Sequence, residues 1–231
     1  MKFTFYFFCI MSIIACLDIS ANESRSPSYN ELNQIYQVAC NTPHNINEHL
    51  PALRQLAAEC DSSIEIGLEN IVSTWAILLG LSESPSSLKS YFGIDIERPP
   101  INRLKLARRL AEQNGIAFRF LKENDMLVEI KPTDLLFIDS LHTYCHLTFE
   151  LEKFSPQIRK YIAMHDTSAP WGELEDDNYF GDYSEYPEHF DRTKKGLWVA
   201  VEDFLNRHPE WTLHQRYFNN YGFTILRRVA E

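Results

Sequence analysis

The sequence has little positive charge, few glycines and no paired cysteine motif, and each shortage argues against a class of protein. Its 22 Lys and Arg stand against 32 Asp and Glu, giving a net charge of −10. This argues against nucleic acid as a partner, because phosphate binding needs clustered cations. With 8 glycines and no GxGxxG motif, a nicotinamide-dependent oxidoreductase is disfavoured. Cys40, Cys60 and Cys145 form no CxxC pair, so they predict neither a zinc site nor a disulfide framework, and one bridge or free thiols both remain open.

A long hydrophobic run occurs only near the start of the sequence. Residues 3–17 are apolar apart from Thr4 and Ser12 and follow Lys2. The run is short for a membrane span and typical of a secretory signal core, with cleavage expected after Ala21. The alternatives are lipid attachment at Cys16, an uncleaved anchor, or a later translation start. Residues 1–21 are therefore interpreted as a signal peptide or membrane anchor of an exported or anchored protein, with a cytoplasmic location as the alternative.

The rest of the sequence changes its hydrophobic period once. Residues 22–62 predict an N-terminal helical extension of two amphipathic helices joined at 40–43. Short apolar runs then alternate with helical patterns, which indicates a parallel sheet with helices on both faces. Strands are predicted at 63–67, 91–96, 117–121, 135–139, 161–164, 211–218 and 222–228. The last two form a hairpin, so the prediction for residues 63–231 is an α/β, Rossmann-like, doubly wound, seven-stranded and mostly parallel sheet with a C-terminal antiparallel hairpin.

Residues 171–192 interrupt this alternation with an acidic and aromatic segment. It is long for a simple connection, which favours a lid or substrate loop, with a solvated insertion as the alternative. Its eight acids are Glu173, Glu175, Asp176, Asp177, Asp182, Glu185, Glu188 and Asp191. Its six aromatics are Trp171, Tyr179, Phe180, Tyr183, Tyr186 and Phe190.

The stretch 134–144, DLLFIDSLHTY, contains the first candidate for chemistry. Its apolar run ends in Asp139, and His142 follows three residues later. Ligands of open α/β sheets bind beyond the carboxyl ends of the strands, where this acid and imidazole are expected. The alternative is that Asp139 caps the next helix and His142 is an ordinary surface residue.

Several short motifs, in this order, resemble one family. They are Glu65-Ile66-Gly67, Ser73-Thr74-Trp75, Gly93-Ile94-Asp95, Phe137-Ile138-Asp139 with His142 and Tyr144, His165-Asp166-Thr167, Gly196-Leu197-Trp198, and residues 219–222. Over roughly residues 30–229 the chain resembles class I S-adenosylmethionine-dependent methyltransferases. More closely, it is similar to small methyltransferases related to the cephalosporin-hydroxylase and sugar O-methyltransferase group.

The resemblance implies S-adenosylmethionine as cofactor and a set of residues that hold it: Glu65, Gly67, Ser73, Asp95, Asn124, Asp125 and Asp139. Gly67 lets the backbone pass close to the cofactor, and the helix start near Ser73 offers N–H groups. Asp95 is expected to accept from both ribose hydroxyls, and Asn124 or Asp125 to contact the adenine amine. Glu65 is expected at the methionine ammonium, with a core glutamate as the alternative.

The first loop departs from the family, which carries more glycines there. It reads Gly67-Leu68-Glu69-Asn70-Ile71, and Asn70 is predicted to replace one glycine in a left-handed conformation. A crowded loop also favours a second hypothesis, namely a catalytically degenerate, exported binding module with a methyltransferase fold.

Methyl transfer to a hydroxyl needs a general base or a metal that lowers the hydroxyl pKa. His142 is the candidate base, oriented by Asp139. The resemblance implies magnesium at the adjacent strand ends, and Asp139, His165 and Asp166 are the candidate ligands for Mg²⁺ or another divalent metal. Metal with base, base alone, and a purely structural role all remain open.

The acceptor is less closely defined than the cofactor. Aromatics in a lid suit stacking on a sugar ring, and the resemblance also implies glycans. The predicted function is O-methylation of a hydroxyl on a sugar, glycan or other small molecule.

Overall fold

The computed structural model describes residues 25–176 and 183–229. The predicted signal or anchor segment, 1–21, lies outside the described residues. None of the helices within the described ranges is both long and apolar enough to cross a bilayer.

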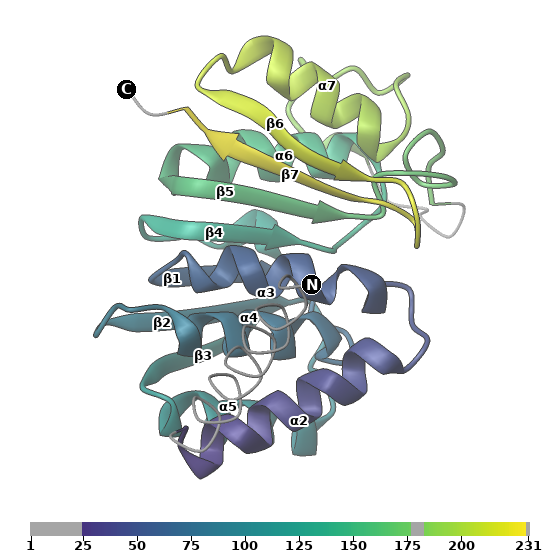
Figure 1. Cartoon of the computed structure of the whole chain (residues 1–231). Coiled ribbons are helices and arrows are strands. Elements are labelled where there is room, and N and C mark those ends of the chain that lie inside the picture. Colours follow the sequence, from purple (N-terminus) through teal and green to yellow (C-terminus); the bar gives the residue numbers. More distant parts are fainter. Residues whose placement is uncertain (1–24, 177–182, 230–231) are drawn as a thin grey trace, which may run out of the picture.

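A single seven-stranded sheet organises the chain, in the order β3-β2-β1-β4-β5-β7-β6 (Figure 1). β1 to β5 pair in parallel, and β7 is antiparallel to both β5 and β6. The strands are β1 (Ser62–Ile66), β2 (Lys89–Asp95), β3 (Ile116–Lys122), β4 (Thr133–Ile138), β5 (Ile158–His165), β6 (Trp211–Tyr217) and β7 (Phe223–Arg228). The predicted fold class is confirmed, with strand limits that shift by up to three residues.

Helices cover both faces of the sheet. One face carries α2 (Pro27–Asn41), α3 (Leu50–Ala58), α4 (Val72–Glu83) and α5 (Ile101–Gln113), and the other carries α6 (Tyr144–Phe154) and α7 (Leu197–Arg207) (Figure 1). Short 3₁₀ turns lie at η1 (Asn47–His49), η2 (Asp125–Leu127), η3 (Ser155–Gln157) and η4 (Tyr183–Glu185). The predicted N-terminal extension, α2 and α3, therefore packs on the same side of the sheet as α4 and α5.

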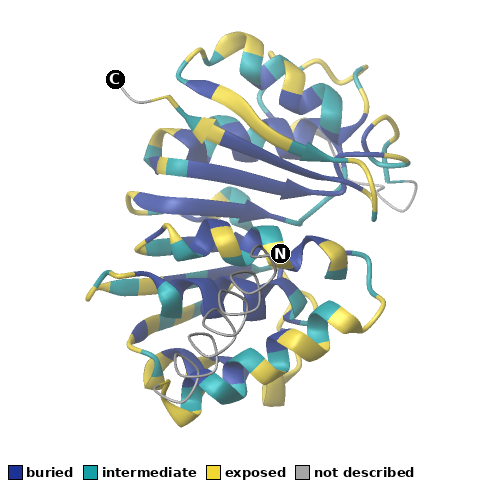
Figure 2. Ribbon diagram, in the orientation of Figure 1, coloured by how far each residue is buried: buried dark blue, intermediate teal, exposed yellow. Residues whose placement is uncertain are grey.

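The strand β4 shows why the sheet needs both layers. All six of its residues are buried, and Leu135 and Phe137 join one core while Leu136 and Ile138 join the other. Successive side chains of a strand point to opposite faces, so a fully apolar strand requires cover on both. Figure 2 shows this burial along the central strands, whereas the edge strand β6 carries four exposed residues in succession.

The helix α4 is apolar on every side because it lies between the sheet and a second layer of helices. Every residue from Ser73 to Leu81 is buried, and α4 packs on α3 and on α2. At Gly80 an added Cβ would lie 2.2 Å from the Arg54 carbonyl oxygen. α3 and α4 therefore pack backbone to backbone.

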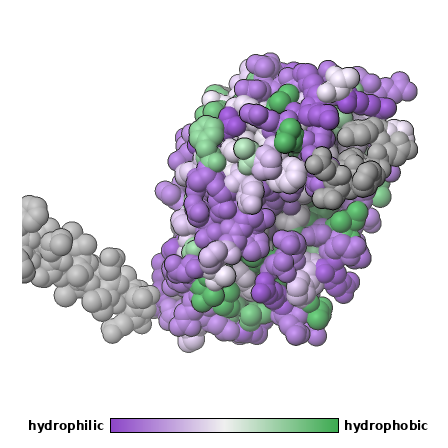
Figure 3. Space-filling model, turned by 90° about the vertical axis from the view of Figure 1, so that its right-hand side faces the viewer, coloured by the Kyte–Doolittle hydropathy of each residue, from purple (hydrophilic) through white to green (hydrophobic). Residues whose placement is uncertain are grey.

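The surface is polar over much of the molecule. In the view of Figure 3, hydrophobic side chains are scattered among hydrophilic ones on the face shown. Cys40, Cys60 and Cys145 are free thiols, so the open question of a bridge among these three is answered in favour of free thiols.

Candidate functional site

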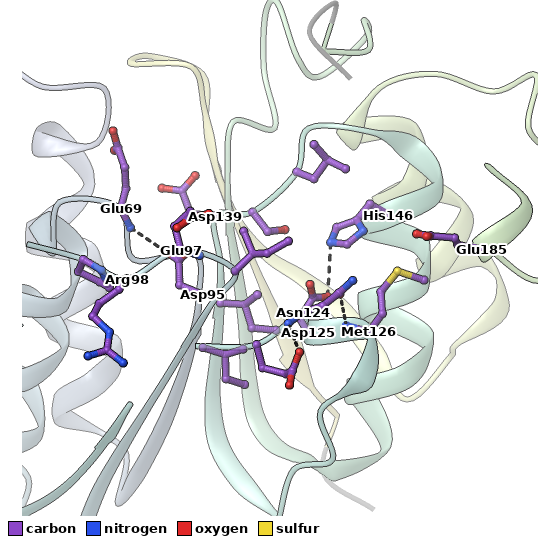
Figure 4. Close-up of a pocket in the computed structure, with 18 of the residues that line it drawn as sticks. Glu69, Asp95, Glu97, Arg98, Asn124, Asp125, Met126, Asp139, His146 and Glu185 are labelled. Carbon is purple, nitrogen blue, oxygen red and sulfur yellow. Dashed lines mark hydrogen bonds and ion pairs between the residues drawn. The ribbon is translucent and has the colours of Figure 1, made fainter. Parts of the chain in front are cut away.

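Two cavities lie at the carboxyl ends of the parallel strands, where the sequence predicts the site. Cavity 1 has a volume of about 650 Å³ and runs from Gly67 past Asp95 to Asp125 (Figure 4). Cavity 2 has a volume of about 300 Å³ and lies against the start of α4, His142 and Asp166. Gly67, Glu69, Asp139 and Ser140 line both cavities. The shared wall makes them two halves of one site.

Gly67 lies where β1 and β4 leave the sheet side by side. Its N–H donates to the Ile94 carbonyl at 2.9 Å, and the Asp139 N–H donates to the Ile66 carbonyl at 2.9 Å. An added Cβ at Gly67 would lie 1.9 Å from the Asp139 carbonyl oxygen, and its φ is +82°. Both the close approach and the left-handed backbone require glycine here.

The loop after Gly67 differs from the prediction. Glu69 and Ile71, with φ of 41° and 64°, have positive φ, and Asn70 does not. The Asn70 prediction is therefore wrong, because the constraint comes from Asp95: its Oδ2 accepts from the Leu68 N–H at 2.7 Å and the Glu69 N–H at 3.0 Å. These bonds hold the chain in a left-handed turn at Glu69 that its own side chain disfavours.

Asp95 holds the backbone around it, in addition to the predicted role of accepting from the ribose hydroxyls. Its Oδ1 also accepts from the Glu97 N–H at 2.7 Å. A carboxylate offers about four lone-pair positions, and the backbone uses three of them. Asp95 lines cavity 1 as predicted, with room for about one further hydrogen bond rather than two.

Glu65 does not line either cavity. Its carboxylate is fully buried and accepts from the hydroxyls of Ser73, Thr74 and Tyr91, the Thr74 bond being 2.7 Å long. Burial raises the pKa of Glu65 to about 7, although the three hydroxyls oppose the rise. The geometry corresponds to the alternative of a core glutamate. Ser73 lines cavity 2 and donates to Glu65, so it connects Glu65 to this cavity.

Asn124 and Asp125 lie at the end of β3, along cavity 1. The Asn124 side chain accepts from the Met126 N–H at 2.9 Å and so begins η2. Seven acids line this cavity beside one arginine, Arg98. They are Glu69, Asp95, Glu97, Glu123, Asp125, Asp139 and Glu185. The lining suits a cationic ligand.

His142 lies between carboxylates that come from two strand ends. Its Nε2 is 2.9 Å from Asp166 Oδ2 and 4.0 Å from Asp139 Oδ1. The predicted orienting residue, Asp139, is thus the more distant of the two, because Asp166 leaves β5 with φ of 58° and comes closer. Asp139 does not cap α6, since Thr143 does so by accepting from the His146 N–H.

His165 lies behind these carboxylates and lines neither cavity 1 nor cavity 2. Its Nδ1 is 3.1 Å from Asp166 Oδ2 and 3.5 Å from Asp139 Oδ1, and its side chain is fully buried. The group whose ligand atoms lie within 4.8 Å of one another is Asp139, His142 and Asp166. His142 therefore occupies the position predicted for His165.

The two histidines and two carboxylates balance one another in charge. Burial alone would lower the pKa of each imidazole, but Asp139 and Asp166 outweigh it and raise the pKa of His142 to about 9 and that of His165 to about 10. The histidines in turn hold the pKa of both carboxyls below their usual range, against the effect of burial. These opposing shifts favour charged imidazoles beside charged carboxylates.

The described part of the acidic and aromatic segment packs on this group. Trp171 stacks on His142 with ring centroids 5.5 Å apart, and the Asp176 N–H donates to the His142 carbonyl at 3.0 Å. Glu175 accepts from the N–H groups of Tyr144 and Gly196, both at 2.9 Å. Asp177, Tyr179, Phe180 and Asp182 lie outside the described residues. A role as lid stays a prediction.

Comparisons with known proteins support the geometry at the level of the fold. No protein-family model matches the chain, and no curated protein sequence matches it either. Solved structures do. A Klebsiella pneumoniae protein described as an O-methyltransferase is 16% identical with a TM-score of 0.51, over 94% of this chain and 97% of that one. A methyltransferase from Geobacter sulfurreducens is 14% identical with a TM-score of 0.51, over 95% and 96%. A Podospora anserina methyltransferase bound to S-adenosylhomocysteine is 12% identical with a TM-score of 0.51, over 100% and 98%.

The chain has the fold of the class I methyltransferases. In this methyltransferase fold, cavity 2 is completed by residues that the sequence did not single out. His44, Asn45 and Ile46, from the turn before η1, line it together with His142. Among the described residues, His44 Nδ1 and Asn45 Oδ1 are buried without a hydrogen-bond partner. No periodicity marks His44 or Asn45, because they belong to a turn.

A second group of ionisable side chains lies at the wall of cavity 1 and was not predicted from the sequence. We call it the wall cluster. It consists of Asp125, His146 and Glu150. His146 and Glu150 are one turn apart on α6, and Glu150 is fully buried. The i, i+4 spacing of an imidazole and an acid was the available signal. Burial raises the pKa of Glu150 to about 8, with the nearby imidazole of His146 opposing the rise.

This shift predicts a pH-dependent effect of Glu150→Gln on metal-free protein. A folded pKa of about 8 against an ordinary value of 4.5 means that the carboxyl favours folding fully below pH 4.5. That contribution is lost as pH rises towards 8. Glu150→Gln should therefore gain stability relative to wild type between pH 5 and pH 8, by a few kcal/mol, roughly 2–4. Urea unfolding in the presence of a chelator measures it.

The matched control is Glu112→Gln, an exposed carboxyl on α5. Its effect on stability should stay within about 0.5 kcal/mol at either pH. A difference between Glu150→Gln and wild type that is the same at pH 5 and pH 8 would contradict the raised pKa.

Proposed function

We propose that the chain is an S-adenosylmethionine-dependent O-methyltransferase that acts on a hydroxyl of a small molecule, with a sugar hydroxyl as the preferred acceptor. The observation that carries the proposal is the shared wall. An acid-lined cavity beyond β1, β2 and β3 meets a histidine–carboxylate group beyond β4 and β5 at Gly67 and Asp139. A cofactor and a base can therefore act on the same atom.

Cavity 1 fits the cofactor in size and charge. Its volume of about 650 Å³ lies within the usual range for cofactor sites, about 300–1,000 Å³. The seven acids suit a molecule with a sulfonium and an ammonium group. Asp95 would take a ribose hydroxyl, and Asn124 or Asp125 the adenine amine. When bound, S-adenosylmethionine supplies a methyl group on a positively charged sulfur.

The start of α4 suits the carboxylate of the cofactor. Val72 and Ser73 line cavity 2, and no described side chain caps the helix there. The first N–H groups of a helix lack partners within the helix and favour an anion. The carboxylate would bind these N–H groups, which leaves Glu65 to position Ser73 from behind.

His142 is proposed as the general base. Asp166, 2.9 Å from its Nε2, orients the ring and stabilises the imidazolium that forms when the acceptor proton is taken up. Trp171 covers one face of the ring and restricts its movement. Asp139, His142 and Asp166 also fit a divalent cation, since their ligand atoms lie within 4.8 Å. Such a cation would lower the pKa of the acceptor hydroxyl.

The walls of cavity 2 favour a small, polar acceptor. Among described atoms, His44 Nδ1 and Asn45 Oδ1 are buried there without a hydrogen-bond partner. Buried polar atoms of this kind are costly unless a ligand completes them. Several hydroxyl groups, as on a sugar ring, would do so, and the aromatic segment beside the site suits stacking on such a ring.

A second candidate function is a binding module that has lost catalysis. The observation that favours it is Asp95, whose carboxylate already accepts three backbone N–H groups and closes the glycine-poor loop. If the loop is rigid, ribose hydroxyls compete poorly for the remaining lone pair. The two candidates differ in a direct measurement of cofactor binding.

We predict that S-adenosylhomocysteine binds the purified full-length chain in the micromolar range or tighter by calorimetry. Asp95→Asn should weaken this binding at least about tenfold, because the amide donates where the carboxylate accepts. Glu112→Gln, exposed on α5, is the control and should bind as wild type does. Absence of binding to wild type would favour the binding module over the enzyme.

The acceptor is sought with labelled S-adenosylmethionine and an array of sugars, glycans and phenols, with and without magnesium. Transfer to sugar hydroxyls supports the finer proposal. Transfer to phenols alone would contradict the sugar acceptor and retain the O-methyltransferase. Activity that survives a chelator would assign the chemistry to His142 without metal.

A further inference from the structure

The wall cluster lies on the side of cavity 1 away from the histidine–carboxylate group. Asp125 begins η2 after β3, and His146 and Glu150 face it from α6. Figure 4 shows the His146 ring directed at Asp125 across the wall of the cavity. The function proposed above uses neither His146 nor Glu150.

The polar atoms of the wall cluster are buried and lack ordinary partners. Within the part of the chain that the structure describes, Asp125 Oδ2, His146 Nε2 and Glu150 Oε2 make no hydrogen bond. His146 is 5% exposed and Glu150 is 0% exposed. Ser140 donates to Glu150 Oε1 at 2.7 Å, so the other oxygen is the one left over. Buried carboxylate oxygens without a hydrogen bond are rare and call for a ligand.

The distances within the wall cluster indicate what kind of ligand it would bind. His146 Nε2 is 3.4 Å from Asp125 Oδ2 and 3.7 Å from Glu150 Oε1. Both separations exceed the usual hydrogen-bond range, about 2.7–3.2 Å. Nitrogen and oxygen ligands about 2.0–2.1 Å from a tetrahedral zinc ion lie about 3.3–3.4 Å from one another. The first separation matches that of two ligands on one small cation. The second, to the Glu150 oxygen that also accepts from Ser140, is slightly longer, and one ligand atom of each residue lies within 4.8 Å of the other two.

The surroundings of His146 agree with this arrangement. Its Nδ1 lies 3.0 Å from the Tyr186 hydroxyl. Metal-bound histidines usually engage their second nitrogen in such a hydrogen bond, which fixes the ring. A bound divalent cation would hold both carboxyls ionised and the imidazole neutral, and it would neutralise the resulting charge of −2.

We propose that Asp125, His146 and Glu150 form a binding site for a divalent cation of the zinc type, separate from Asp139, His142 and Asp166. The imidazole ligand favours zinc over magnesium, which prefers oxygen alone. The ion joins η2 to α6 and so fixes one wall of cavity 1. Three protein ligands leave a fourth position for water or for a ligand in the cavity.

The test removes the other candidate cation group first. The full-length chain carrying His142→Gln and Asp166→Asn is the parent, stripped with a chelator and titrated with Zn²⁺ by calorimetry. The parent should bind one equivalent at micromolar concentration or tighter. Adding His146→Gln or Glu150→Gln should weaken that binding at least about 100-fold, since loss of a ligand exceeds the loss of an outer contact, which costs about 10–100-fold.

The matched control is His208→Gln. His208 also lies between two acids, but its nitrogens are 3.0 Å from Glu152 and 3.1 Å from Glu210, at hydrogen-bond distance. This variant should bind zinc as the parent does. Zinc should also raise the melting temperature of the parent and not that of Glu150→Gln, which keeps the test valid if His146→Gln folds poorly.

Three outcomes would overturn the proposal. The first is a parent that binds zinc only at millimolar concentration. The second is equal zinc binding in the parent and in Glu150→Gln, which would locate the ion elsewhere. The third is loss of zinc in His208→Gln alone. None of these results depends on cofactor binding or methyl transfer, so failure here is distinct from failure of the proposed function.

Discussion

Substituting alanine for Gly67 is expected to lower the free energy of unfolding by about 3 kcal/mol or more and to abolish detectable binding of S-adenosylhomocysteine. A side chain at φ of +82° costs about 1–2 kcal/mol by itself, and forcing atoms into a filled space costs about 1–3 kcal/mol more. The new Cβ would lie 1.9 Å from the Asp139 carbonyl oxygen. Sheet-like hydrogen bonds hold both segments, so neither can yield cheaply. Urea unfolding and calorimetry measure the two effects.

Gly115 offers a matched control for this prediction. Its φ is +73°, and no described atom lies within 4 Å of an added Cβ. Gly115→Ala should therefore cost only the conformational part, about 1–2 kcal/mol, and leave cofactor binding unchanged. The difference between the two variants measures the close approach of Gly67 to Asp139. Equal losses of stability would show that the loop relaxes and that the approach is not required.

His142→Gln and Asp166→Asn are each expected to lower methyl transfer about 100- to 10,000-fold, the usual contribution of a positioned base. The affinity for S-adenosylhomocysteine should change less than about threefold, because neither residue lines cavity 1 and neither belongs to the start of α4 proposed for the cofactor carboxylate. Single-turnover assays with the acceptor from the array, together with calorimetry, separate the two quantities. His214→Gln, on the exposed edge strand β6, should retain full activity.

The pH profile distinguishes a base from a structural residue at position 142. With a pKa of about 9, His142 is mostly protonated at pH 7, and only its neutral form can accept a proton. The value of kcat/KM should therefore rise about tenfold per pH unit from pH 7 and level off near pH 9. Asp166→Asn should move this limb to lower pH, since the carboxylate is one of the groups that raise the pKa. A flat profile in wild type would remove the base role.

The sheet was predictable because its signals are local. The strand β4 has a short apolar run followed by Asp139, and a residue such as Phe137 can be buried only if helices cover both faces. The hairpin of β6 and β7 follows from the turn residues between two runs. For the same reason Asp95, Asp139 and Asp166 could be assigned to one edge of the sheet from the order of the strands alone.

The errors come from contacts between distant parts of the chain. The Asn70 prediction rested on the intrinsic preference of Asn, but the backbone at Glu69 is set by Asp95, 26 residues away. Asp139 precedes His142 by three residues, yet Asp166 comes closer because β5 lies beside β4. The wall cluster combines η2 with α6, and the i, i+4 pair on α6 does not by itself show that Asp125 lies beside it. Local pattern cannot report such distances.

The turn before η1 has a consequence for the order in which the protein becomes complete. Asn220 donates to the His44 carbonyl at 3.1 Å, and His49 Nε2 lies 3.0 Å from the Asn219 carbonyl, contacts that span about 170 residues. During synthesis the turn before η1 leaves the ribosome well before the hairpin loop that fixes it is made. Cavity 2 therefore takes its final form only after residues 219–220 have been synthesised.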